Sequence, residues 1–248
     1  MKRYLQTLIK IASFLLFLLA WNGAAAFIDN RFLFPGVWDV VTSLKDIVTD
    51  GGFFLIVLGT LKKLVMAIAV AGTLAIILGV VSYRYKAVRI VLLPYVSFVK
   101  SVPTIAMIIL VLIWIRAEVV PIVVGALILF PILYDNIISG IESVDRSIVK
   151  MSKVFKVRRM RMLGDVYIPG VYFHIAGGIH SLIGLGFKVI IAGEVLSQEN
   201  QSIGGEILLN KVYLESSRIF AWVIVVIFIN FLIEQGVLFF NRKIGSWR

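Results

Sequence analysis

Six long runs of apolar residues limit what this chain can fold into. They cover residues 11–28, 64–82, 90–115, 119–138, 171–193 and 219–240. A helix needs about 20 apolar residues to cross roughly 30 Å of hydrocarbon. Apolar residues make up 60% of the 248 residues and charged residues 16%, whereas soluble domains hold about 45–50% and 25%. The sequence predicts an all-α polytopic membrane protein in which six transmembrane helices form one domain over residues 1–248.

The positive charges orient these six spans. With the N-terminus inside, sixteen of the 25 Lys and Arg residues lie in cytoplasmic segments and seven, including Lys62 and Lys63, in external ones; Lys100 and Lys188 fall within spans. Cytoplasmic loops of membrane proteins are enriched in Lys and Arg. We therefore expect both termini in the cytoplasm, and the net charge of +11 needs no nucleic-acid partner.

The first apolar run has a second interpretation. Lys2, Arg3 and Lys10 come before or at its start and residues 24–26 are all Ala, a pattern that also occurs in cleavable signal peptides. The run of 18 residues exceeds the 7–15 residues typical of a signal peptide, which favours a retained span. Cleavage would leave five spans and an external N-terminus.

Two patterns near the second run predict helix faces. After the turn at Pro35-Gly36, apolar residues between Val37 and Val48 recur at helical spacing, which predicts an amphipathic helix on the outer membrane surface. Within the run, small residues follow each other at four-residue spacing and predict close helix packing. These are Ala67, Ala71, Ala75 and Gly79.

Composition excludes several kinds of site. The chain has no Cys, so thiol chemistry and disulfides are absent. His174 and His180 stand six residues apart, which does not place them at metal-ligand spacing on one helix face. We predict no catalytic residue, no metal and no cofactor. The chain also lacks the G-x-x-x-x-G-K-[ST] phosphate loop, so it does not hydrolyse ATP by itself.

Residues 139–170 form the one long loop on the predicted cytoplasmic side, and they carry seven of its sixteen positive charges. Apolar residues recur at helical spacing in 148–155 and again in 160–166. This predicts two short helices with an apolar stripe and a basic remainder. A solvated loop that faces lipid headgroups would have the same composition.

This loop resembles the permease subunits of binding-protein-dependent ABC importers, in particular their nitrate, sulfonate and taurine branch. The family's cytoplasmic signature is Glu-Ala-Ala, a Gly four residues later and a Pro thirteen residues after that. When Pro169 is taken as the anchor, Lys150-Met151-Ser152 occupy the Glu-Ala-Ala positions and Lys156 the Gly position. The spacing matches, although the signature letters differ.

Four other segments resemble the same family in the same order, so the resemblance covers about residues 30–240. Residues 32–44 resemble the segment before the second span, 92–114 the third span, 130–145 the fourth span and 187–204 the exit of the fifth.

The resemblance implies a type I importer fold in the inner (plasma) membrane of a prokaryote. Its partners would be a second permease chain in a homodimer, two cytoplasmic ATPase subunits that bind the ATP, and an external substrate-binding protein that meets residues 194–217. Transport would follow alternating access, with nitrate, a sulfonate, taurine or a vitamin precursor as substrate. The residues implied in ATPase coupling are Lys150, Met151, Ser152, Phe155, Lys156, Val157, Arg158, Arg159, Gly164 and Pro169.

Two departures from the signature have physical consequences. A Gly can take positive φ where the first coupling helix ends, whereas a Lys in that conformation costs about 1 kcal/mol. Either Lys156 tolerates this conformation or the turn is built differently. Lys150 reverses the charge of the usual Glu, so we expect a dedicated ATPase with a compensating acidic contact.

Lys100, near Pro103, and Lys188 lie inside predicted spans. A charge there costs at least about 2.5–3.5 kcal/mol on insertion scales. These lysines, with Pro103 and Glu194, are candidates for an anion pathway. Alternatively, the lysines reach the membrane interface or pair with a carboxylate such as Glu194.

Two other functions remain open at this point. A secondary transporter driven by an ion gradient commonly has internal repeats and membrane-embedded carboxylates. The sequence shows no clear repeat, and its carboxylates cluster at span ends. A structural membrane scaffold would not need the intramembrane lysines.

Overall fold

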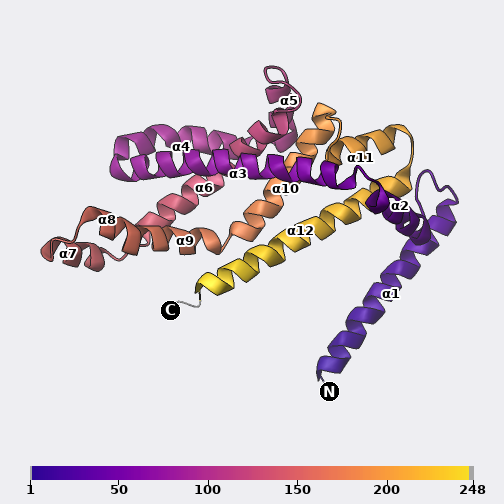
Figure 1. The fold of residues 1–248 in the computed structure, drawn as a ribbon, viewed down its shortest axis with the longest axis horizontal. Coiled ribbons are helices and arrows are strands. Elements are labelled where there is room, and N and C mark those ends of the chain that lie inside the picture. The colour runs from indigo at the N-terminus through magenta and orange to yellow at the C-terminus, as the bar shows by residue number, and fades with distance from the viewer. Residues whose placement is uncertain (1, 246–248) are drawn as a thin grey trace. The chain divides into compact units, whose positions relative to one another are not determined.

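The structure is a computed structural model that describes residues 2–245, without the side chains of residues 2, 3, 146, 153, 159, 173 and 240–245. Within this range every regular element is a helix (Figure 1), which confirms the all-α prediction. The helices form two compact units. One consists of Met1–Leu58 and Asn200–Ile229, and the other of Gly59–Glu199 and Asn230–Arg248.

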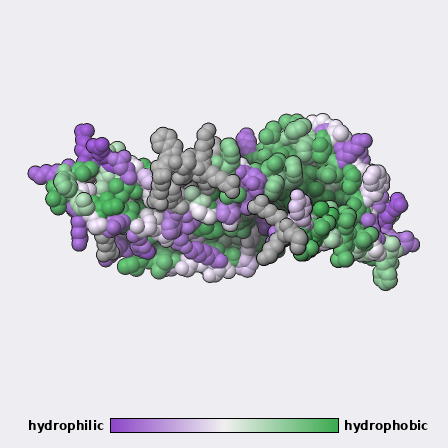
Figure 2. Space-filling model, turned by 90° about the horizontal axis from the view of Figure 1, so that it is seen from below, coloured by the Kyte–Doolittle hydropathy of each residue, from purple (hydrophilic) through white to green (hydrophobic). Residues whose placement is uncertain are grey.

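Five of the described helices are long and apolar enough to cross a membrane, and the pair α4 and α5 makes a sixth if it counts as one broken span. The five are α1 (Lys2–Ile28), α3 (Phe53–Arg84), α6 (Val120–Glu142), α10 (Ile179–Ser197) and α12 (Ser216–Gly245). Apolar side chains cover much of the surface (green in Figure 2), as expected for helices that face lipid. Helix α3 begins at Phe53, well before the predicted second span of 64–82. Lys62 and Lys63, which were predicted in an external segment, therefore lie inside this helix.

The predicted third span is not one straight helix. It consists of α4 (Lys86–Ser101) and α5 (Thr104–Leu112), which meet at 102°. Val102 is extended, with φ −75° and ψ 127°, because the ring of Pro103 disfavours helical backbone in the residue before it. Pro103 also lacks the N–H that would continue the helix.

The predicted fifth span began too early. Residues 171–176 belong to a separate helix, α9 (Ile168–Ala176), and the span itself is α10, which begins at Ile179. Gly177 and Gly178 separate the two helices, because consecutive glycines lose more backbone entropy in a helix than other residues do.

An aromatic cluster holds together the first unit, which contains α1, α2 (Val37–Thr49), α11 (Ile203–Val212) and the first part of α12. The ring of Trp21 lies 5.9 Å from that of Phe34 and 5.2 Å from that of Phe220. The indole N–H of Trp21 donates to the carbonyl oxygen of Pro35 at 2.9 Å. Helix α2 buries Val40 and Ile47, which confirms the amphipathic helix predicted there.

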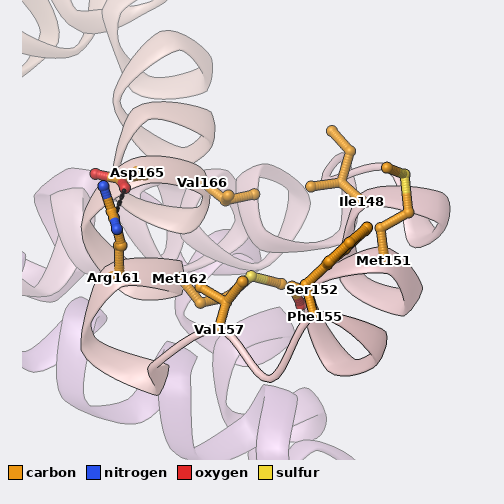
Figure 3. A pocket seen from close by; sticks show the side chains of 9 residues that line it. All are labelled: Ile148, Met151, Ser152, Phe155, Val157, Arg161, Met162, Asp165 and Val166. Carbon is orange, nitrogen blue, oxygen red and sulfur yellow. Dashed lines mark ion pairs between the residues drawn. The ribbon is translucent and has the colours of Figure 1, made fainter.

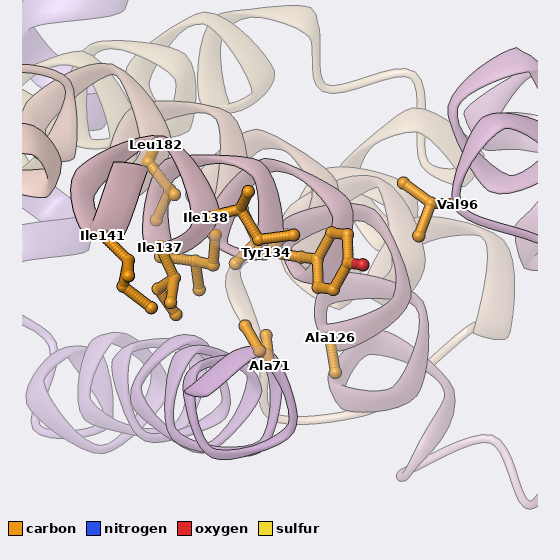
Figure 4. Close-up of a cluster of buried hydrophobic side chains, with 11 residues drawn as sticks. Ala71, Val96, Ala126, Tyr134, Ile137, Ile138, Ile141 and Leu182 are labelled. Atoms are coloured by element: carbon orange, nitrogen blue, oxygen red, sulfur yellow. The ribbon is translucent and has the colours of Figure 1, made fainter. Parts of the chain in front are cut away.

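Helix α6 is the centre of the second unit, where α4, α5, α9 and α10 contact it. Its residues Tyr134, Ile137 and Ile141 lie in a buried apolar cluster with Ala71 of α3 and Leu182 of α10 (Figure 4). The hydroxyl of Tyr134 donates to the hydroxyl oxygen of Ser82 on α3 at 2.9 Å. This polar contact ties α6 to α3 beside the cluster.

Small residues let the helices of this unit approach closely. The predicted ridge on α3 is buried at every position, from Ala67 to Gly79. A Cβ on Gly125 of α6 would lie 3.0 Å from the Cβ of Ala67, and one on Gly79 would lie 2.9 Å from the side chain of Ile137. The prediction of close packing along the ridge is therefore confirmed.

Replacing Gly140 by Ala should destabilise the second unit. The added Cβ would lie 2.7 Å from the Cα of Val171 on α9, and overpacking of this kind costs about 1–3 kcal/mol. Gly72→Ala is the matched control, because nothing lies within 4 Å of its Cβ. Thermal unfolding in mild detergent should show a lower midpoint for Gly140→Ala only. Equal midpoints for the two variants would contradict the packing described here.

Candidate functional site

Residues 146–167 form a compact segment, here called the basic hairpin. It contains α7 (Arg146–Val154), α8 (Arg159–Met162) and the π-helical turn η1 (Leu163–Tyr167), which confirms the two short helices predicted. Asp145 caps α7, because its Oδ1 accepts the backbone N–H of Ser147 at 2.8 Å. This hydrogen bond lowers the pKa of the Asp145 carboxyl, so the cap stays ionised at neutral pH.

Lys156 adopts the left-handed backbone conformation that the signature's Gly position implies. Its φ is 50°, and the N–H of Val157 donates to the carbonyl oxygen of Ser152 at 2.9 Å. A hydrogen bond that closes around a left-handed residue is a common way to end a helix. The turn is thus built with Lys in place of Gly, which settles the alternative left open above.

Apolar side chains from both arms of the basic hairpin surround a cavity of about 380 Å³. Ile148 and Met151 come from α7, Phe155 directly follows it, and Met162 and Val166 lie opposite (Figure 3). Arg161 and Asp165 form an ion pair of 3.4 Å at its edge. The hairpin therefore presents an apolar hollow with polar groups beside it.

The other residues predicted for coupling lie in or next to this segment. Lys150 and Arg158 are exposed, Gly164 lies in η1, and Pro169 stands in the first turn of α9, where a missing N–H is tolerated. The side chain of Arg159 lies outside the described residues. The structure thus brings the predicted positions together, and their coupling role stays a prediction.

The predicted pathway residues do not form one group. Lys100 of α4 forms an ion pair with Asp135 of α6, and Pro103 caps α5. Lys188 is exposed on α10, although Phe187 and Val189 beside it are buried. Glu194 does not serve either lysine as the suggested partner, because it pairs with Lys63 instead.

A buried ion cluster joins α3 to the end of α10. The ammonium of Lys63 lies 2.9 Å from Oε1 of Glu194 and 2.7 Å from Oε1 of Glu199. The side chains of the three residues are 12%, 0% and 12% exposed. Thr60, one helical turn before Lys63, donates its hydroxyl to Oε2 of Glu194 at 3.1 Å.

The turn that ends α10 brings the second carboxylate to the cluster. Gln198 is left-handed, with φ 54°, and the N–H of Glu199 donates to the carbonyl oxygen of Glu194 at 3.1 Å. Sequence reasoning missed this cluster because it treated Lys63 as one external charge among seven. The available signals were the spacing of Thr60 and Lys63 on one helix face and the carboxylate of Glu194, which was considered as a partner for other lysines.

Glu199 lies just beyond the α10 span, and burial raises the pKa of its carboxyl while Lys63 acts against that shift. Glu194 and Glu118 raise the pKa further by repulsion. A raised pKa in the folded state means that the protonated carboxyl favours folding. This contribution is complete below the ordinary pKa of Glu and is lost as the pH rises through the raised value.

The part of the chain that the structure describes contains no group of three or more His, Asp or Glu residues that could hold a metal ion. The candidate site has two parts. One is the surface of the basic hairpin, and the other is the buried ion cluster around Lys63.

The fold and this segment identify the class of protein. Residues 71–246, more than two thirds of the chain, match the family described as binding-protein-dependent transport system inner membrane component. The chain belongs to this family. It is a permease subunit of an ABC importer and not an enzyme, and the family works with ATPase and substrate-binding partners.

Individual relatives agree with this assignment. A protein of Methanocaldococcus jannaschii named as an ABC transporter permease is 23% identical over 98% of this chain and 93% of its own length. The taurine transport system permease TauC of Escherichia coli is 23% identical over 92% of this chain and 84% of its own. A Bacillus subtilis protein named as the aliphatic sulfonates transport permease SsuC is 21% identical over 84% of this chain and 76% of its own.

A solved structure shares the fold. One chain of the crystal structure of an amino acid ABC transporter with histidines superimposes with a TM-score of 0.62 over 77% of this chain and 94% of that chain, at 16% identity. The type I permease fold implied by the sequence is therefore confirmed. Because the chain belongs to this family, the alternative of a secondary transporter driven by an ion gradient is excluded.

Replacing Lys63 by Met should destabilise the protein, because two carboxylates would remain in a buried site without their cation. Removal of one partner from a buried ion pair costs about 3–5 kcal/mol. Lys62→Met is the matched control, since Lys62 is the neighbouring residue on α3 and is exposed. The unfolding midpoint in detergent should fall for Lys63→Met alone. Equal shifts for the two variants would show that the cluster contributes little.

Replacing Lys156 by Gly should stabilise the basic hairpin, because Gly adopts a positive φ without the roughly 1–2 kcal/mol that a side chain adds. Lys150→Gly is the control, since Lys150 lies inside α7 and a Gly there costs about 1 kcal/mol. Amide hydrogen exchange in α7 should slow in the first variant and quicken in the second. A change of the same sign in both would argue against the left-handed turn.

Proposed function

We propose that this permease imports a small sulfonate, such as taurine or an alkanesulfonate, by alternating access. The observation that carries this proposal is that two relatives matching 84% and 92% of this chain are named for aliphatic sulfonates and taurine. Two copies of the chain would enclose the pathway, with both termini in the cytoplasm and one ATPase subunit for each permease chain.

Lys188 supports an anionic substrate. Its side chain is exposed on α10, within a candidate span. A charged side chain at that depth is costly unless it meets water, a partner or another chain. In a dimer, two copies of this lysine along the pathway would attract a sulfonate.

The basic hairpin is the part that would meet the ATPase. It corresponds to the family's signature segment, and its apolar side chains are largely exposed. Closure of the two ATPases on ATP would move the hairpin, and the transmembrane helices would then reorient toward the outside. The predicted external segment 194–217, which contains α11, would receive the loaded binding protein.

The test is transport by the reconstituted assembly. The permease, its ATPase and its binding protein are placed in vesicles, and uptake of radiolabelled taurine, an alkanesulfonate and nitrate is measured with and without ATP. We expect ATP-dependent uptake of a sulfonate in preference to nitrate. Preference for nitrate, or uptake without ATP, would overturn the proposal.

Lys188→Gln should lower this uptake about tenfold or more, because it removes a positive charge from the pathway. Lys45→Gln is the control, since Lys45 is also an exposed lysine but lies in α2, outside the candidate spans and outside residues 194–217. Uptake should stay unchanged in the control. Unchanged uptake by Lys188→Gln would remove Lys188 from the pathway.

A further inference from the structure

The basic hairpin has one sign of charge almost throughout. Residues 146–162 contain seven Lys and Arg residues and no Asp or Glu. Lys150, Lys156, Arg158 and Arg161 are all exposed. Arg161 has an acidic neighbour in Asp165, whereas the ion pairs among the described residues include neither Lys150 nor Lys156. A partner that covers this surface must supply negative charge to avoid strong repulsion.

The same surface is also strongly apolar. Met151, Val154, Phe155 and Met160 are 58%, 77%, 73% and 78% exposed. Side chains of this size gain stability when they leave water, and large exposed apolar patches mark interaction sites. They interleave in sequence with Lys150 and Lys156, so a single partner would cover the apolar and the basic groups together.

Lys156 is informative because it occupies its position at a cost. The left-handed conformation at φ 50° would be free of strain with Gly, and strained residues cluster where function requires them. The Lys156 side chain at this strained position is exposed and carries a charge that Gly could not offer to a partner. Lys156 follows the exposed Val154 and Phe155 in the chain, so its ammonium group is close to their apolar side chains in sequence.

We propose that Lys150 and Lys156 of the basic hairpin select the cognate ATPase through an acidic rim on the surface of that ATPase that receives the hairpin. This inference rests on the proposed ATPase-coupling role of the hairpin. An ATPase whose groove carries neutral or basic groups at these points is excluded by charge, which is a form of selection against wrong partners.

The shape of the surface favours a protein over an anionic lipid surface as the occupant. Apolar side chains from α7, from η1 and from the end of α8 surround a hollow of about 380 Å³ (Figure 3). A flat lipid interface suits the apolar face of a single helix, whereas a hollow between two arms accommodates a protruding side chain of a folded partner.

The test measures the affinity of the purified ATPase for the full-length permease in discs of neutral phosphatidylcholine. Lys156→Gly is the decisive variant, because it should make the turn more stable and yet weaken ATPase binding about tenfold or more at low salt. Lys150→Glu should weaken binding at least as much. For both variants the difference from the unaltered protein should shrink at high salt, because salt screens charges at a surface.

Phe155→Ala tests the ATPase-coupling role of the hairpin separately from ATPase selection by Lys150 and Lys156. It removes an apolar anchor, so binding should weaken at low and high salt alike. If Phe155→Ala releases the ATPase and the lysine variants bind normally, the hairpin couples to the ATPase but the acidic rim is wrong. If none of the three variants changes binding, the coupling role itself is wrong.

Two further measurements complete the test. A carbodiimide, which joins an amine to a carboxylate without a spacer, should link Lys150 or Lys156 to an Asp or Glu of the ATPase in the assembled transporter. Links from these lysines to other proteins only would overturn the proposal. Vesicles that contain phosphatidylglycerol are the probe for the lipid alternative. Loss of their binding by the lysine variants, with ATPase binding intact, would assign the hairpin to the membrane surface.

Discussion

The close approach of α6 to its neighbours is the contact on which the second unit depends. Gly125 of α6 meets Ala67 of α3, Gly140 meets Val171 of α9, and Pro121 meets Gly193 of α10. Helices in a membrane gain little from the hydrophobic effect when they associate, so packing between small residues supplies much of the attraction. The same contacts bring α3 and α10 near enough for Lys63 to reach Glu194, and they support the helix from which the basic hairpin continues.

The sequence predicted the elements whose signal is local. Apolar runs marked the spans, and four-residue spacing marked the ridge on α3. The family resemblance put Lys156 at a position where a left-handed turn is usual, and the φ of 50° decides between the two alternatives left open there. What it did not predict depends on contacts distant in sequence or on backbone breaks inside apolar runs. Lys63 was assigned to an external segment because it directly precedes the second apolar run, and only the fold shows Glu194, 131 residues away, as its partner.

The two features of the candidate site differ in kind. The Lys63 cluster is buried, satisfied largely within the unit and suited to holding α3 and α10 in one arrangement. The basic hairpin is exposed, strained at Lys156 and apolar where water should meet it. A permease needs a rigid helical body and an exposed surface for its ATPase. Motion of the ATPase can reach the helices only through a surface that the ATPase contacts.

The break between α4 and α5 sets a limit on where this protein can touch lipid. Interruption of the helix at Val102-Pro103 leaves backbone carbonyls of α4 and N–H groups of α5 without helical partners, and hydrocarbon cannot satisfy them. That side of the pair must therefore face protein or water at whatever depth the break lies. A stretch of polar backbone is thus built into an otherwise apolar span.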